Sequence, residues 1–302
     1  MKNLKTITDF IRYACTQFTQ ANLYYGHGTD NAFDEAAALV LGLLKLPYDL
    51  HFAYFSANLT DEEQQILFVG IHKRINEHMP VPYITHRTFY GGVEFYVDQR
   101  VLIPRSPIVE MIESGMQPWW EGTAPQRILD LCCGSGCLGI LAKLYQPQAE
   151  LVLADIDPQA LDVCAINIDR LGIDDGSITM VESDGFQKIT GQFDWIICNP
   201  PYVEEEEMKT IVEEYHYEPV HALISGSDGL ELTRVILKQA SRYLTDNGLL
   251  ILEVGMTWTS LEEAYPDLDF EWVEFERGGQ GVCVINADEL KAWELAGLLA
   301  PL

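Results

Sequence analysis

Apolar and polar residues follow different periods along the chain, and the first stretch has the period of helices. From residue 6 to about residue 79, apolar residues recur three or four positions apart, as in amphipathic helices. Thr60 and Glu63 form a capping box that predicts the start of one helix, and Pro80 predicts its end. We therefore expect residues 1–85 to form a small helical domain.

Residues 86–106 have the character of strands and link this domain to the rest of the chain. Apolar runs at 88–90 and 93–97, separated by two glycines, predict a β-hairpin. The run at 101–103 predicts a further short strand. Ser106 then follows as a candidate cap for the next helix.

From residue 107 to residue 302, strand and helix patterns alternate. The predicted strands are residues 127–131, 150–154, 177–182, 193–198 and 249–253, followed by a glycine-joined pair at 270–275 and 282–285. Five strand–helix units with such a closing pair predict an α/β fold. We expect a doubly wound, mainly parallel sheet of seven strands with an antiparallel edge, which is a Rossmann-like architecture.

The tetrapeptide Asn199-Pro200-Pro201-Tyr202 directly follows the buried strand at 193–198. Two consecutive prolines hold the backbone extended just past the strand tip, where open α/β sheets bind their ligands. There, the Asn199 side-chain oxygen and the Pro200 carbonyl are two acceptors for a planar –NH2 group, and Tyr202 offers it an aromatic face. A plain strand-ending loop would have the same residues, because Asn-Pro and Pro-Pro are common turn formers.

A planar –NH2 nitrogen is a poor nucleophile because its lone pair is delocalised. Hydrogen bonds from both of its N–H groups to fixed acceptors favour positive charge on nitrogen in the transition state. They also orient the lone pair for in-line attack. The tetrapeptide therefore suits a reaction at an amide or exocyclic amino nitrogen.

A glycine-rich loop at residues 132–139 turns from the first predicted strand of the sheet into a helix. It contains the pattern G-x-G-x-x-G, and Asp155 ends the next strand, so a nicotinamide dehydrogenase is an alternative. Against it, Asp130 would place negative charge beside a pyrophosphate. No acid or base for hydride transfer follows the fourth strand, where Asn199 stands.

Acidic residues at three successive strand ends fit a cationic nucleoside better. Asp130 suits an ammonium group, Asp155 can accept from both ribose hydroxyls, and Asp184 can accept from an adenine amino group on which Phe186 could pack. These features predict S-adenosyl-L-methionine as the cofactor. The candidate cofactor-binding residues are Asp130, Cys132, Cys133, Gly134, Ser135, Gly136, Asp155, Ile156, Asp184, Gly185, Phe186 and Asn199.

The net charge of −27, from 46 acidic and 19 basic residues, bears on the choice of partner. Proteins that bind nucleic acid through its phosphates present a basic face, so no nucleic-acid specificity is expected. The charge fits a basic partner, and general solubility explains it equally well.

The chain has no sign of a membrane or export segment. No apolar run approaches the ~20 residues that cross a bilayer, and the N-terminus lacks a signal-peptide core. The chain has seven cysteines, an odd number, and several lie within strand or helix patterns, which predicts buried thiols in a reducing compartment, the cytoplasm. Cys132, Cys133 and Cys137 lack companions at the spacing of a zinc site, so we expect no metal.

Taken in order, these features resemble the HemK/Prm-type protein glutamine methyltransferases over essentially the whole chain. The shared pattern is a helical N-terminal domain, a hairpin motif at 90–95, a Pro-Arg connector, a D-x-x-x-G-x-G loop and N-P-P-Y. Residues 218–230 resemble the family's E-P…A-L…G-x-D-G-L segment. In the hairpin motif, Tyr90 stands where the family has phenylalanine.

Two bacterial branches of this family differ in substrate. One methylates a glutamine of peptide-chain release factors, and the other, the PrmB type, methylates a glutamine of large-subunit ribosomal protein three (uL3). Residues 25–31, residues 101–107 and Cys132 resemble the PrmB type. In that branch, a protein of this kind transfers a methyl group from S-adenosyl-L-methionine to the amide nitrogen N5 of a glutamine in this basic ribosomal protein.

The resemblance also assigns roles to particular residues. It implies that Asn199, Pro200, Pro201 and Tyr202 hold the target amide. By exclusion, we expect the helical domain to recognise the protein substrate. Release-factor methylation stays open as an alternative, and so does methylation of an adenine amino group in nucleic acid, which uses a similar pocket.

Overall fold

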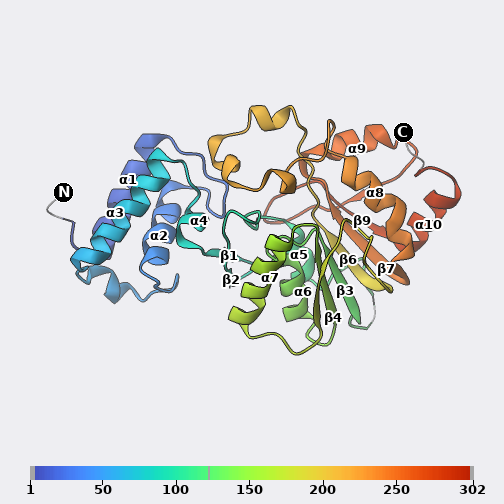
Figure 1. Ribbon diagram of the computed structural model, residues 1–302, viewed down its shortest axis with the longest axis horizontal. Helices are drawn as coiled ribbons and strands as arrows, with labels where there is room; N and C mark the ends of the chain where they lie inside the picture. Colours follow the sequence, from blue (N-terminus) through green and yellow to red (C-terminus); the bar gives the residue numbers. More distant parts are fainter. Residues whose placement is uncertain (1–3, 122, 300–302) are drawn as a thin grey trace.

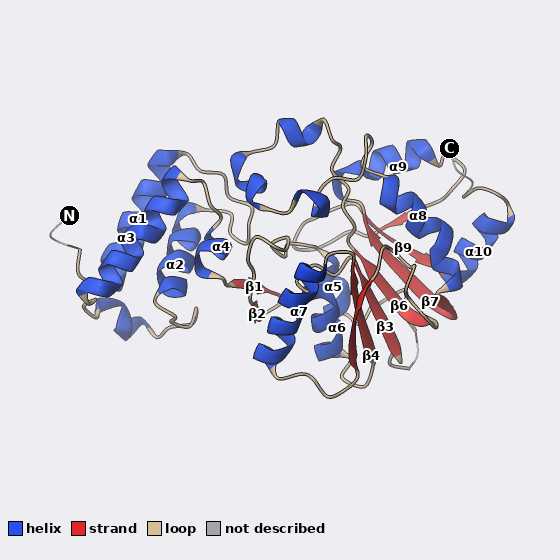
Figure 2. Cartoon of the chain, viewed as in Figure 1, coloured by secondary structure: helices blue, strands red, loops and turns tan. Residues whose placement is uncertain are grey.

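The computed structural model describes residues 4–121 and 123–299, which form two lobes (Figure 1). Helices alone make up the smaller lobe at the N-terminal end, and a β-sheet covered by helices makes up the larger one (Figure 2). A short hairpin lies between the two lobes (Figure 1).

The helical lobe is built from amphipathic helices that bury one face each. The α-helices are α1 Ile7–Ala21, α2 Ala32–Leu43, α3 Asp61–Asn76 and α4 Val81–Thr85, with a 3-10 helix η1 at Phe52–Ser56. The predicted capping box at the start of α3 is present, because Thr60 accepts from the Glu63 N–H and Glu63 accepts from the Thr60 N–H. Phe10, Leu39 and Leu67 are fully buried where α1, α2 and α3 meet.

The hairpin pairs β1 (Thr88–Tyr90) with β2 (Val93–Phe95) in antiparallel register. The prediction of a strand at 101–103 is wrong. The Ile103 N–H donates to the Glu218 carboxylate and not to a neighbouring strand. Ser106 does act near the next helix, α5 (Ile108–Glu113), since its Oγ accepts from the Ile108 N–H at 3.2 Å.

The large lobe contains the expected doubly wound sheet of seven strands. The strands are β3 Arg127–Leu131, β4 Glu150–Asp155, β5 Ile178–Glu182, β6 Phe193–Cys198, β7 Leu244–Glu253, β8 Glu271–Trp272 and β9 Val282–Asn286. Their order is β5-β4-β3-β6-β7-β9-β8, in which β9 runs antiparallel to both of its neighbours and the first five strands are parallel. The predicted strand at 270–275 is reduced to the two residues of β8.

Helices cover both faces of this sheet (Figure 2). They are α5, α6 Cys137–Tyr145, α7 Pro158–Leu171, α8 Glu231–Gln239, α9 Trp258–Ala264 and α10 Ala287–Leu295. Successive residues of a strand point to opposite faces. Ile197 accordingly packs with Ile140 of α6, and Ile196 packs with Leu237 of α8. In the part of the chain that the structure describes, no helix is long and apolar enough to cross a membrane.

Residues 203–225, which we call the bridging segment, follow the tetrapeptide after β6. The segment contains only the 3-10 helices η2 Glu207–Lys209, η3 Glu213–Tyr217 and η4 Val220–Ala222. Its two ends meet in a parallel bridge between Val203 and Ile224. In Figure 1 it is the gold segment that lies between the helical lobe and the sheet.

Candidate active site

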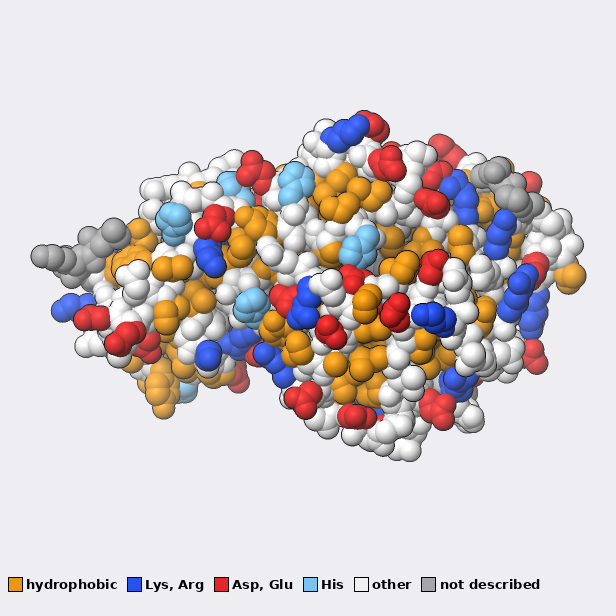
Figure 3. All heavy atoms as spheres, in the orientation of Figure 1, with side chains coloured by type: hydrophobic (Ala, Val, Ile, Leu, Met, Phe, Trp, Pro, Cys, Tyr) orange, Lys and Arg blue, Asp and Glu red, His pale blue; other side chains and the backbone are white. Residues whose placement is uncertain are grey.

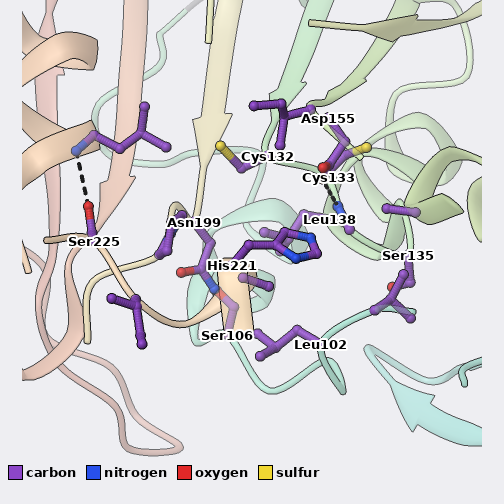
Figure 4. A pocket seen from close by; sticks show the side chains of 18 of the residues that line it. Leu102, Ser106, Cys132, Cys133, Ser135, Leu138, Asp155, Asn199, His221 and Ser225 are labelled. Atoms are coloured by element: carbon purple, nitrogen blue, oxygen red, sulfur yellow. Dashed lines mark hydrogen bonds between the residues drawn. The ribbon is translucent and has the colours of Figure 1, made fainter. Parts of the chain in front are cut away.

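A cavity of about 550 Å³ lies beyond the carboxyl ends of β3, β4 and β6 (Figure 4). Strands β4 and β6 flank β3, so the cavity sits where the strand order reverses and open α/β sheets bind their ligands. The predicted residues that line it are Cys132, Cys133, Gly134, Ser135, Asp155, Ile156, Asp184, Asn199 and Pro201. The structure therefore brings together residues from the ends of four strands, β3, β4, β5 and β6, that are distant in the sequence.

The loop after β3 turns sharply into α6 through left-handed backbone conformations. The φ angles of Cys132, Gly134 and Gly136 are 62°, 54° and 77°. A side chain at Gly136 would place its Cβ 2.9 Å from Cys164 Sγ, so only glycine fits this position. Cys132 adopts a conformation that costs a residue with a side chain about 1–3 kcal/mol, and such strain is commonly found at functional sites.

Asp130 is placed differently from the expectation that it contacts the cofactor. Its side chain is buried beneath the loop and does not line the cavity. One carboxylate oxygen accepts from the Gly139 N–H at 2.7 Å, which fixes the first turn of α6. Burial raises the pKa of Asp130 to about 7, so its environment favours the neutral acid. In this structure Asp130 shapes the loop from below.

Asp155 faces the cavity at the end of β4. Its two carboxylate oxygens accept from the Gly134 N–H at 2.9 Å and from the Asp157 N–H at 3.0 Å. These bonds connect the ends of two strands, and burial raises the pKa of the carboxyl. A carboxylate has about four lone-pair positions, so Asp155 can accept two further hydrogen bonds from a ligand.

The loop after β5 contributes less to the cavity than expected. Asp184 lines the cavity, whereas Gly185 and Phe186 do not. The Phe186 ring is buried and stacks on Tyr243, with ring centroids 4.5 Å apart and an angle of 9° between the planes. The structure thus places Phe186 in the core beside α8 and not against the space for an adenine ring.

The tetrapeptide after β6 turns one polar side chain into the cavity. Asn199 and Pro201 line it, Pro200 is buried, and Tyr202 is half-buried behind them. Figure 4 shows the Asn199 amide directed into the open space. No described residue hydrogen-bonds this amide, so its oxygen is available to a ligand.

The cavity suits S-adenosyl-L-methionine by the chemistry of its lining. Ser135 Oγ is buried, lines the cavity and has no hydrogen-bond partner among the described residues. An unpaired buried hydroxyl is costly unless a ligand satisfies it. Ser135 and the free positions of Asp155 can bind the hydroxyl and ammonium groups of this cofactor. No His, Cys, Asp or Glu cluster that could hold a metal occurs in the described ranges.

Several lining residues were not among the sequence candidates. They come from the connector (Leu102, Ser106), from the bridging segment (His221, Ser225) and from α8 (Glu231). His221 Nε2 lies 3.3 Å from Asp157 Oδ2, which brings the bridging segment against the start of α7. For Leu102, Ser106, His221 and Ser225 the signal in the sequence was the family resemblance of residues 101–107 and 218–230, and Glu231 directly follows the second of these stretches.

Buried ion pairs join the bridging segment to the neighbouring elements. Arg105 of the connector donates two hydrogen bonds to Glu218, of 2.6 and 2.8 Å. Arg74 of α3 lies 3.0 Å from Glu214 and 3.3 Å from Glu35, and all three side chains are buried. The segment that leaves the tetrapeptide is therefore fixed to the helical lobe.

Comparison with known proteins identifies the family. The chain is 41% identical over 96% of its length to a protein of Neisseria meningitidis serogroup B named "Ribosomal protein uL3 glutamine methyltransferase", and the match covers 95% of that protein. A protein of the same name from Neisseria gonorrhoeae is also 41% identical, with 96% of this chain and 97% of the relative covered. The chain belongs to this family.

Two further matches agree with the uL3 glutamine methyltransferase family. Residues 120–229 match the family described as methyltransferase small domain. The solved hMettl16 catalytic domain in complex with the MAT2A 3'UTR hairpin 6 has a TM-score of 0.50 at 15% identity, covering 76% of this chain and 82% of that one, which supports the fold alone. The protein is thus a methyltransferase that uses S-adenosyl-L-methionine, and the resemblance found in its motifs is confirmed.

Proposed function

We propose that the protein methylates the side-chain amide nitrogen of a glutamine in ribosomal protein uL3, with S-adenosyl-L-methionine as the donor, in the cytoplasm. Its relatives with 41% identity over 96% of the chain carry the name of this activity. The observation that carries the proposal is the Asn199 amide, which faces the cavity at the strand tip with its oxygen free.

The tetrapeptide would activate the side-chain nitrogen of the target glutamine by holding it in a fixed position and orientation. When bound, S-adenosyl-L-methionine supplies an electrophilic methyl group on a positively charged sulfur. The Asn199 oxygen and the Pro200 carbonyl accept the two N–H groups of the glutamine, so that charge on the nitrogen is favoured and its lone pair is aimed. Tyr202 does not line the cavity, so its half-buried ring would act by supporting Asn199 and Pro201 from behind. The surplus proton leaves to water, because a charged N-methyl amide is very acidic.

The residues that would hold the cofactor come from the ends of β3, β4 and β5. We assign the ribose hydroxyls to Asp155 and the neighbouring polar contacts to Gly134, Ser135 and Asp184. Cys132, Cys133 and Ile156 provide apolar wall around them. A carboxylate at the end of the second strand of such a sheet is well placed for ribose hydroxyls.

We infer that residues 1–85 recognise the protein substrate. A groove of about 910 Å³ between the helical lobe and the hairpin supports this role. Arg105 lines both this groove and the cavity, so the two spaces meet at one side chain. A polypeptide lying in the groove would therefore bring a glutamine close to Asn199.

Methyl transfer from labelled cofactor tests the proposal. The protein is incubated in parallel with purified uL3, a release factor and DNA, and the labelled product is digested and located by mass spectrometry. We expect label on one glutamine of uL3. Label on the release factor would replace uL3 as the substrate, and label in DNA would overturn glutamine chemistry.

A further inference from the structure

Glu253, the last residue of β7, is a buried carboxyl in a place where no helix cap or surface ion pair requires one. Its exposed fraction is 5%. In the parallel pairing of β6 and β7, Cys198 is opposite Leu252, so Glu253 stands beside Asn199 at the same edge of the sheet. The carboxyl is therefore next to the tetrapeptide and behind the cavity wall.

Two hydroxyl groups approach the Glu253 carboxylate. Ser106 Oγ donates to Oε2 at 2.5 Å, and the Tyr202 hydroxyl lies 3.4 Å from Oε1 and donates to it. The charged or titratable groups around it are Arg105, Tyr202 and Tyr90. No described cation makes an ion pair with it, so a hydroxyl occupies each oxygen.

Two glycines pack closely against Tyr202, one against its ring and one against its carbonyl oxygen. A Cβ on Gly255 would lie 2.5 Å from the Tyr202 ring, so the ring packs directly on a bare backbone. A Cβ on Gly229 would lie 2.3 Å from the Tyr202 carbonyl oxygen. Both glycines have positive φ, of 50° and 72°. Glu253 thus accepts the hydroxyl of Tyr202, and Gly255 packs against the ring of the same residue.

We propose that Glu253 is a positioning residue for methyl transfer, which accepts the Tyr202 hydroxyl and so fixes the Tyr202 ring behind Asn199 and Pro201, the two tetrapeptide residues that line the cavity. The proposal rests on the function proposed above and adds a residue behind the tetrapeptide to it. The Ser106 bond has a second effect, since Ser106 lines the cavity and its Oγ accepts from the Ile108 N–H at the start of α5. The Glu253 carboxylate therefore binds both Tyr202 of the tetrapeptide and Ser106 of the connector, and it fixes the position of one relative to the other.

A purely structural role is the competing explanation, and burial weighs against it. An isolated buried carboxyl destabilises a fold unless it is fully satisfied, and an apolar residue would fill the same space at lower cost. Burial raises the pKa of Glu253 to about 7, in spite of the Ser106 and Tyr202 hydroxyls and the nearby Arg105. A buried titratable group with a strongly shifted pKa next to a cavity is a common mark of a functional site.

A double-mutant cycle between Glu253→Gln and Tyr202→Phe tests the proposal. Glutamine keeps the shape, and phenylalanine keeps the ring without the hydroxyl. We expect Glu253→Gln to lower kcat about tenfold, which is about 1.4 kcal/mol and within the range of a hydrogen bond to a charged group. In the Tyr202→Phe background the same change should lower kcat less than about twofold, because the bond is already absent.

The cycle has two outcomes that overturn the proposal. One is a kcat of Glu253→Gln within about twofold of the wild type, and the other is an equal loss in both backgrounds. Cofactor affinity, measured by calorimetry, should stay within about twofold throughout, because neither residue lies among the groups assigned to the cofactor. Wild-type protein that methylates nothing in the uL3 assay refutes the proposed function, and the cycle is then run on the substrate that is labelled.

The pH dependence of kcat gives a second readout that a structural role would not move. Protonation weakens the carboxylate as an acceptor, so the wild-type kcat should fall as the pH is lowered through about 7. Glu253→Gln should lack this acid limb, and the same profile in both proteins overturns the proposal. Glu294→Gln is the matched control, because Glu294 of α10 also accepts from a serine, Ser241 Oγ, at 2.9 Å. This substitution should leave kcat and its pH profile unchanged.

Discussion

Asp130 and Asp155 lie near the ends of neighbouring strands, yet their carboxyls have different surroundings. Asp130 is enclosed below the loop with a single backbone donor, Gly139. Asp155 faces the cavity and keeps acceptor positions free. Sequence motifs place both at a cofactor site, whereas side-chain direction separates them.

Replacing Asp130 tests whether it acts through the fold. Burial raises its pKa to about 7, so the folded protein holds the proton more tightly than the unfolded chain. Its contribution to stability is full below pH about 4 and is lost as the pH rises through 7. Asp130→Asn should therefore raise the free energy of unfolding by about 1–3 kcal/mol more at pH 8 than at pH 5. Thermal unfolding at both pH values measures this, and an equal effect at both would contradict it.

Asp155→Ala should act on the cofactor. We expect the dissociation constant for S-adenosyl-L-methionine to rise at least about tenfold, because two ribose hydroxyls lose a charged acceptor. Asp130→Asn is the matched comparison and should change this constant less than about twofold. Isothermal calorimetry reads both, and wild-type affinity in Asp155→Ala would remove Asp155 from the site.

Asn199→Ala should lower kcat at least about 100-fold, the scale found when one oriented polar group is removed from an active site. Cofactor affinity should change far less, since the amide acts on the acceptor nitrogen. Asn76→Ala, at an exposed position at the end of α3, provides the control. A methyl-transfer rate in Asn199→Ala equal to that of the control would exclude the proposed role.

At the scale of elements, the central strands were predictable and the irregular segments were not. β3 and β6 have the predicted limits because each is an apolar run that ends at turn residues. The bridging segment has no period, and its position depends on Glu214 and Glu218, whose partners lie more than 100 residues away in sequence. The position of Phe186 was not predictable for a related reason, since the sequence does not reveal that its ring stacks on Tyr243.

Arg74, Glu35 and Glu214 form an ion cluster between the helical lobe and the bridging segment, and we expect it to stabilise the fold strongly only when all three charges are present. Arg74→Met would leave the Glu35 and Glu214 carboxylates buried without their cation. Breaking a buried pair in this way costs about 3–5 kcal/mol. Arg242→Met removes an exposed partner of Glu294 and should cost at most about 1 kcal/mol. Urea unfolding compares the two, and equal losses would show that the cluster is not a unit.

At the scale of the whole molecule, acidic side chains are spread over both lobes on the face shown in Figure 3. The net charge of −27 should attract a basic protein substrate over a distance that salt shortens. We expect KM for uL3 to rise several-fold between about 50 and 300 mM salt. Cofactor affinity should be nearly constant over this range, and a KM independent of salt would argue against electrostatic recruitment.

The attachment of the bridging segment to α3 also restricts how the protein can be divided. Glu214 accepts from Arg74 and from the Tyr24 N–H, so both partners of a buried carboxylate belong to the helical lobe. A truncated chain that begins after this lobe would leave the Glu214 carboxylate without these partners, in the segment that directly follows the tetrapeptide. Chimaeras of two relatives should consequently inherit the helical lobe and the bridging segment from the same parent.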